Sequence, residues 1–318
     1  MKFILFFSLV ISSTVTMAQT RGSMKLETLR ELNLSKPLQE GRPAFVSAAS
    51  GLVKAHGDFY AVSDDENHIV RIPEDKTKVC EAFRIFSQEL PLDHAERKKK
   101  KADFEALGFI EPSAQLPFGA LLLMPSGSKP QRTKGALLAF TAKGVLSPKV
   151  EDIDFAPLYS VLKKKLKKIN IEGLVVSNGS MKLFNRGNEA GSANAVIDVN
   201  YTLFPFKANI SQISTVDLGK ENGFSISFTD AHMTATGEIW FLAAAEKTTS
   251  SYDDGEFLGG FVGQLLLGNK ISQLQRQNFP RKPEGIFVDK SQGKTRFYFV
   301  TDADDSKVPS ILLTALLN

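Results

Sequence analysis

Five residues that open similar segments of the chain carry side chains that can bind a cation. They are Ser50, Glu105, Glu172, Asp230 and Glu284. Four of them are carboxylates, and carboxylates crowded into one place must be neutralised by protons or by a cation. Oxygen ligands at several positions match Ca²⁺, which takes roughly six to eight oxygens in irregular geometry, whereas Zn²⁺ favours His and Cys. We therefore expect a Ca²⁺ site at these residues.

The same positions also have a structural explanation. An acid at the start of a strand can cap backbone N–H groups, and the Gly that follows Glu172 and Glu284 permits the close approach of a neighbouring strand. His232, two residues after Asp230, has no second His or Cys beside it in the sequence, so we expect it to be structural or on the surface. Both explanations are kept open at this point.

Four other residues are candidates for chemistry on a phosphate group. The guanidinium groups of Arg186 and Arg132 can hold phosphoryl oxygens in a fixed geometry. A carboxylate such as Asp64 or Asp302 can orient a water molecule. The sequence contains no Gly-x-Ser-x-Gly elbow, paired-Cys metal spacing, His-Glu-x-x-His or phosphate loop. Two functions therefore stay open: a Ca²⁺-dependent phosphohydrolase, and a non-enzymatic protein that binds a small anionic molecule or a protein partner.

The elements that position these residues form a repeat. Each repeat begins with a small or acidic residue, continues as an apolar strand and a turn, and ends with a second apolar strand and polar residues, as in 172–176 and 182–186. The five openings are 54 to 67 residues apart, which suits blades of four strands. The pattern predicts an all-β, five-bladed β-propeller. Six blades are the alternative, if residues 200–223 supply another blade.

This architecture predicts where the polar residues meet. In a propeller blade the first strand lines the tunnel and the second runs antiparallel beside it, so the start of one and the end of the other lie at the same mouth. Residues 26–34 are expected to add an outer strand to the last blade, which closes the ring without a long exposed edge. The candidate residues from all five blades should therefore converge.

Lysine-rich segments interrupt the strand pattern in two places. Residues 157–168 carry Leu158, Leu162 and Leu166 at helical spacing between lysines, and we predict one short basic helix there. Both this lysine run and the run at 98–101 are interpreted as solvated surface.

The ends and the composition suggest an exported protein. Residues 1–18 combine Lys2, an apolar run and Thr16-Met17-Ala18, which is typical of a signal peptide, so 19–318 is expected to be a single propeller domain that is periplasmic or secreted. No later segment approaches the roughly 20 apolar residues of a membrane span.

The net charge of +4 is too small to predict nucleic-acid binding. The single Cys80 cannot form an intrachain disulfide, and we expect a monomer.

Several motifs resemble known families. The chain resembles a bacterial family of unknown function over nearly its whole mature length. The motifs that carry this resemblance are Phe104-Glu105, 126–128, 170–173, 185–188 and 301–305. That resemblance implies the fold and no activity.

A more distant resemblance is to the calcium-activated nucleotidases, or soluble apyrases. Residues 60–65 and 283–286 are similar to the first and last blades of those five-bladed propellers, which hold a central Ca²⁺ through alternating Ser and Glu. Ser50, Glu105, Glu172 and Glu284 match that alternation. Asp230 stands where a Ser is expected, and 126–132 replaces a Lys-Glu-Trp stretch, so the resemblance implies the metal more than nucleotide hydrolysis. Esterase-like phytase domains share the Glu-Gly pattern.

Overall fold

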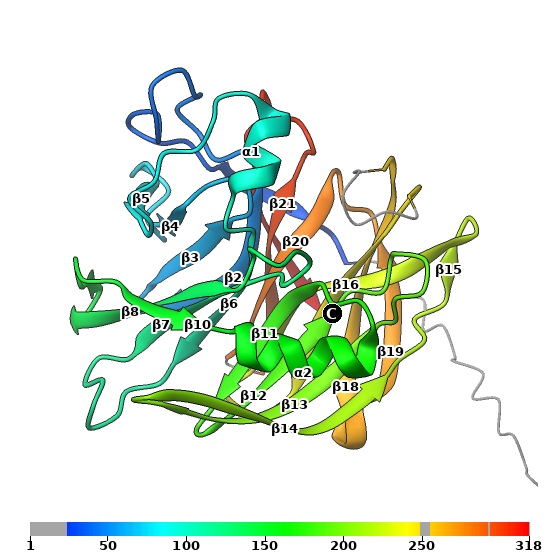
Figure 1. Ribbon diagram of the computed structural model, residues 1–318. Helices are drawn as coiled ribbons and strands as arrows, with labels where there is room; N and C mark the ends of the chain where they lie inside the picture. The colour runs from blue at the N-terminus through cyan, green and yellow to red at the C-terminus, as the bar shows by residue number, and fades with distance from the viewer. Residues whose placement is uncertain (1–23, 249–254, 292, 318) are drawn as a thin grey trace, which may run out of the picture.

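The protein folds as a five-bladed β-propeller (Figure 1). The computed structural model describes residues 24–248, 255–291 and 293–317, so the predicted signal peptide lies outside the described residues. Each blade is an antiparallel sheet whose strands run outward in order from the tunnel. Blade 1 contains β2 (Ala49–Ala55), β3 (Asp58–Ser63), β4 (His68–Ile72) and β5 (Glu81–Arg84). Blade 2 contains β6 (Phe104–Ile110), β7 (Ala120–Pro125), β8 (Lys134–Ala142) and β10 (Glu151–Asp154), and β9 (Val145–Leu146) pairs with β8.

The remaining blades follow the same plan. Blade 3 contains β11 (Ile171–Ser177), β12 (Ser180–Asn185), β13 (Ala195–Leu203) and β14 (Phe206–Thr215). Blade 4 contains β16 (Phe224–Met233), β17 (Ile239–Glu246), β18 (Phe257–Leu266) and β19 (Lys270–Gln277), with β15 (Lys220–Glu221) paired to β16 and a 3₁₀ turn at Leu267–Asn269. Blade 5 contains β20 (Lys282–Ser291), β21 (Lys294–Asp302), β22 (Ile311–Leu317) and β1 (Glu27–Glu31).

Blade 5 closes the ring as expected from the sequence. Strand β1 pairs antiparallel with β22, with Glu31 opposite Ile311, so the two ends of the described chain share one sheet. The alternative of six blades is wrong. Residues 200–223 do not start a new blade, because most of them belong to the β13–β14 hairpin, in which Ala195 pairs with Thr215. That hairpin forms the outer half of blade 3.

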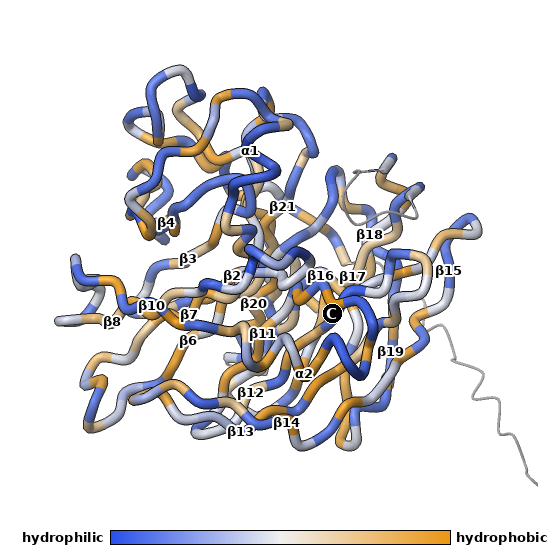
Figure 2. The backbone as a smooth tube through the Cα atoms, in the orientation of Figure 1, coloured by the Kyte–Doolittle hydropathy of each residue, from blue (hydrophilic) through white to orange (hydrophobic). Residues whose placement is uncertain are grey.

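The core is divided among the interfaces between blades. Five apolar clusters of described residues occur, one between each pair of neighbouring blades. Apolar residues concentrate in the blade strands, while the chain around α1 (His94–Lys100) is mostly hydrophilic (Figure 2). Both faces of a blade pack against neighbours, which explains why strands such as β7 and β17 are buried along their whole length.

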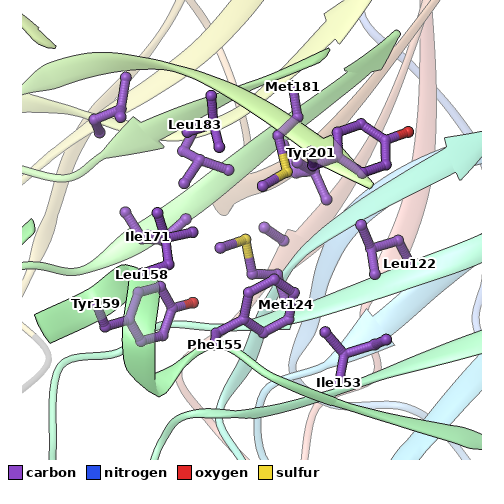
Figure 3. Close-up of a cluster of buried hydrophobic side chains, with 14 of the residues drawn as sticks. Leu122, Met124, Ile153, Phe155, Leu158, Tyr159, Ile171, Met181, Leu183 and Tyr201 are labelled. Carbon is purple, nitrogen blue, oxygen red and sulfur yellow. The ribbon is translucent and has the colours of Figure 1, made fainter. Parts of the chain in front are cut away.

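The predicted basic helix is present as α2 (Ala156–Leu166). Its apolar face, with Leu158, Tyr159 and Leu162, packs into the cluster between blades 2 and 3 (Figure 3). The Tyr159 hydroxyl donates a hydrogen bond to the carbonyl oxygen of Pro125, which fixes the helix against the end of β7.

A second helix, α1, was not expected. It carries charged residues throughout and so lacks the apolar spacing that reveals a helix, although Asp93 caps it by accepting from the backbone N–H of Glu96 at 2.9 Å. The prediction of a solvated loop at 98–101 is therefore wrong for the helix and for Lys101, while Lys99 and Lys100 are exposed as expected. Lys101, directly after α1, is 5% exposed.

The five inner strands surround the tunnel, and each contains a β-bulge near the mouth. Neighbours among β2, β6, β11, β16 and β20 contact one another around the ring. The residues left unpaired by the bulges are Gly51, Glu105, Glu172, Thr229 and Glu284. A bulge re-aims a side chain relative to the regular pleat. In blade 4 the bulged residue is Thr229, so Asp230 is one residue out of register with the acids of the other blades.

Replacing Gly51 with Ala should destabilise the ring more than the same change at Gly179. Both glycines have positive φ, +55° and +71°, so both variants incur the left-handed strain of about 1–2 kcal/mol. At Gly51 the added Cβ would also lie 3.0 Å from the backbone N of Leu107, whereas nothing lies within 4 Å at Gly179. We expect Gly51→Ala to lose about 1–3 kcal/mol more stability in chemical denaturation. Equal losses would contradict close packing at the axis.

Candidate metal centre at the propeller mouth

A cavity of about 280 Å³ lies at the mouth of the propeller. It is lined by nine carboxylate side chains and by five Lys or Arg side chains, so its lining is acidic overall. Eight of the nine residues predicted from the sequence line it: Ser50, Asp64, Glu105, Arg132, Glu172, Arg186, Glu284 and Asp302. The ninth, Asp230, is absent from the lining.

The best-placed metal ligands are Asp64, Asp103 and Glu105. Each offers one carboxylate oxygen, and the three oxygens lie within 4.8 Å of one another. Asp64 follows β3, and the bulge in β6 positions Glu105. In the described part of the chain, the Glu105 carboxylate forms no hydrogen bond or ion pair, and the buried Asp64 Oδ1 has no hydrogen-bond partner. Oxygen atoms are therefore available for a hard cation, and the donor set contains no His or Cys.

Lys101 provides an internal positive charge beside these three acids. Its Nζ lies 3.2 Å from Asp103 Oδ1 and 3.3 Å from Asp65 Oδ1, and it donates a hydrogen bond to Asp64 Oδ2. Burial alone would lower the pKa of Lys101, but Asp64 and Asp103 raise it well above its usual value, so the ammonium stays charged. Burial raises the pKa of Asp64 to about 7, although Lys101 opposes the rise.

Asp103 was not predicted, although it precedes Glu105 by two residues. It is 3% exposed and forms an ion pair with Arg132, with 2.7 Å between Nη1 and Oδ2. Ser126 Oγ also donates to Asp103. Ser126 is fully buried, and its contact and that of Arg132 with Asp103 hold the segment 125–132 against the start of β6.

Ion pairs also neutralise the acids on the other side of the mouth. Arg186 contacts Glu172 at 3.2 Å and pairs with Glu246. Lys282, which the sequence analysis did not identify, lies 3.2 Å from Glu246 and 3.0 Å from Glu284. Burial raises the pKa of Glu284 to about 8, while Lys282 lowers it and Glu172 raises it further. Of the four acids predicted from the sequence, Glu172 and Glu284 are therefore compensated by cations of the chain itself.

The side chains of Ser50 and Asp230 form hydrogen bonds with backbone groups of neighbouring blades. Ser50 Oγ donates to the carbonyl oxygen of Glu105 at 2.9 Å. Asp230 Oδ2 accepts from the N–H groups of Ile286 at 2.8 Å and Leu52 at 3.3 Å, which ties blade 4 to blades 5 and 1. This arrangement matches the capping role considered for the ring acids. Burial raises the pKa of Asp230 well above its usual value.

His232 and Asp302 lie in different environments. The His232 ring packs against the Phe287 ring with 4.4 Å between centroids and an interplanar angle of 53°. Burial lowers the pKa of His232 to about 4, and its side chain does not line the mouth cavity. Asp302 lines the cavity and accepts from the backbone N–H of Asp304 at 2.8 Å. Burial and the neighbouring Asp304 raise the pKa of Asp302 well above its usual value, although Lys282 opposes this.

Comparison with known proteins gives a family match and several similar folds. The model of the family of unknown function DUF6929 matches residues 45–317. No curated protein matches the chain. Similar solved structures include a luciferin-regenerating enzyme (12% identity, 92% of this chain and 95% of that chain, TM-score 0.45) and an α-L-arabinanase from Penicillium chrysogenum (10%, 92% and 98%, TM-score 0.47). A gluconolactonase from Xanthomonas campestris is also similar (8%, 92% and 90%, TM-score 0.40).

Within the described residues, no helix is long and apolar enough to cross a membrane.

Proposed function

The chain belongs to the DUF6929 family of unknown function, and we propose that the mouth of its propeller binds Ca²⁺ through Asp64, Asp103 and Glu105. The observation that carries the proposal is the convergence of three carboxylate oxygens on the wall of an acidic cavity, with Glu105 unpaired within the described chain. Export would suit such a site, because extracellular modules bind Ca²⁺ with dissociation constants of roughly 0.1–1 mM.

We propose further that the cavity receives a phosphate ester and that the protein hydrolyses it. A bound Ca²⁺ would supply Lewis-acid polarisation of a phosphoryl oxygen. Asp302, which lines the cavity and whose pKa is raised by burial and by Asp304, would relay a proton from the attacking water to the leaving oxygen. Arg132 lies at the cavity wall, where its guanidinium pairs with Asp103 and donates to Ser128 Oγ and to the Lys98 carbonyl oxygen, so its Nε is the atom that would orient a phosphoryl oxygen.

One observation favours the alternative of ligand binding without turnover. Arg186 is held by Glu172 and Glu246, and Arg132 is held by Asp103, so both arginines expected to grip a phosphoryl group are already paired with carboxylates. A propeller that binds a Ca²⁺-associated ligand needs no free arginine. Release of product from a phosphate ester, lost when Ca²⁺ is chelated, distinguishes hydrolysis from binding.

Thermal melts in Ca²⁺ and in chelator test the metal site. Wild-type protein should gain about 2.7 kcal/mol at a hundredfold excess of Ca²⁺ over the dissociation constant. Glu105→Gln should lose this gain, yet be as stable as wild type or more stable in chelator, because burial and Glu172, Asp64 and Asp103 all disfavour the charged Glu105. Glu111→Gln, at an exposed position directly after the same strand, is the control and should keep the gain.

Two results would overturn the metal site. The first is a wild-type melt that does not respond to Ca²⁺, and the second is a full response in Glu105→Gln. Because the variant is expected to remain folded in chelator, its loss of response cannot be attributed to unfolding.

A further inference from the structure

A second cavity, of about 320 Å³, lies beside the mouth and has the opposite charge. The two cavities share Asn170 and Arg186 in their walls. The charged residues that line the second cavity are Lys163, Lys167, Lys168, Arg186 and Glu189. We call it the basic cavity. The proposed mechanism does not use it, although its lysines come from the run that the sequence analysis interpreted as solvated surface.

Lys163 and Lys167 are the two charges of the basic cavity that an incoming anion would meet. Neither pairs with a carboxylate in the described part of the chain, whereas Lys168 lies 2.9 Å from Glu189. Lys163 is half-buried, and burial lowers its pKa. A partly desolvated ammonium without a counter-charge gains more from binding an anion than a fully hydrated one does.

The backbone that presents Lys167 is strained. Lys167 ends α2 with φ 62° and ψ −50°, and the N–H of Lys168 donates to the Leu166 carbonyl oxygen at 2.7 Å. This is a γ-turn with positive φ, which is rare and unfavourable for a residue with a Cβ. Glycine would fit the position better. Strain of this kind persists where the surroundings impose it and often marks a functional position.

Stabilisation of the C-terminal end of α2 does not explain why Lys163 and Lys167 line the basic cavity. Lysines in the last turn of a helix interact favourably with its dipole. Lys164 and Lys165 can serve that purpose from the exposed face, and neither lines the cavity. Lys163 and Lys167 are placed differently, since both line the basic cavity next to the acidic mouth.

We infer that the basic cavity binds a second anionic group of the ligand whose first group enters the mouth, so the substrate class is phosphate compounds with two anionic groups. This inference rests on the proposed function, because the mouth supplies the first binding site. The difference in charge between two adjoining cavities would orient such a molecule, with the second group among Lys163, Lys167 and Lys168.

The test measures binding of inorganic pyrophosphate by calorimetry in the presence of chelator, when the mouth holds no Ca²⁺. Wild-type protein should bind. Lys163→Gln combined with Lys167→Gly should weaken binding at least roughly tenfold, because two charge-assisted contacts are lost. Lys164→Gln combined with Lys165→Gln removes the same charge from the same helix and should leave binding within about twofold. Since glycine relieves the strain at position 167, the cavity variant should fold.

Three results would overturn the inference: no binding of pyrophosphate to wild type at millimolar concentration, equal weakening in both pairs of variants, or no weakening in either. The Glu105→Gln variant separates this failure from failure of the metal site. It should lose the Ca²⁺ response and keep pyrophosphate binding in chelator.

Discussion

Replacing Arg186 with Met should lower the free energy of unfolding by about 3–5 kcal/mol. Arg186 is 8% exposed and pairs with Glu172 and Glu246, which are also buried. Without the guanidinium, Glu172 would lose its ion pair in a poorly solvated site, and Glu246 would have to share Lys282 with Glu284. Chemical denaturation of the variant at pH 7 measures the loss.

A matched control is Arg71→Met. Arg71 also contacts two carboxylates, Asp58 at 2.7 Å and Glu81 at 3.2 Å, but its side chain is 27% exposed. That variant should lose about 1 kcal/mol or less. Adding Glu172→Gln and Glu246→Gln to Arg186→Met should recover part of the stability, because the carboxylates that lost the guanidinium are neutralised as well. Equal losses of stability in Arg71→Met and Arg186→Met would show that burial does not determine how much these ion pairs contribute to stability.

Lys101→Met should lower the stability of the protein in chelator and raise its affinity for Ca²⁺. In chelator the variant leaves Asp64, Asp65 and Asp103 without their shared ammonium, and we expect a loss of about 3–5 kcal/mol. The affinity for Ca²⁺ should rise roughly tenfold, since a competing cation within about 4 Å has gone. Saturating Ca²⁺ should therefore recover about 1.4 kcal/mol of this loss, because the ion takes the place of the missing charge.

Titration of Ca²⁺ against the melting temperature measures both effects in one experiment. Lys54→Met is the control, because Lys54 pairs with the exposed Glu74 at 2.8 Å and should change neither quantity by much. If Lys101→Met bound Ca²⁺ more weakly than wild type, Lys101 would help to form the site instead of competing with the ion. The proposed ligand set would then be wrong.

The sequence by itself determined the fold and the place where the polar residues meet. Repeat spacing predicts five blades, because each blade is a local hairpin series whose strands and turns are encoded by neighbouring residues. Residues before Ser50 could be assigned to the last blade because an unpaired edge must be closed. Once the blades are known, eight of the nine predicted site residues, Glu105 among them, fall at the mouth by topology alone.

The register and the charge balance were decided only by the tertiary structure. A bulge one residue earlier in β16 than the repeats suggest places Thr229 in the ring and turns Asp230 to the backbone of other blades. Lys101 and Lys282 are lysines like any others in the sequence, yet they are buried between carboxylates. Each of these lysines lies two residues before one acid that it contacts, but Lys101 also pairs with Asp64 and Lys282 with Glu246, which belong to other blades. Residue spacing carries no information about those distances between blades. The sequence therefore indicated acids at a mouth, and the structure showed which of them remain available to a cation.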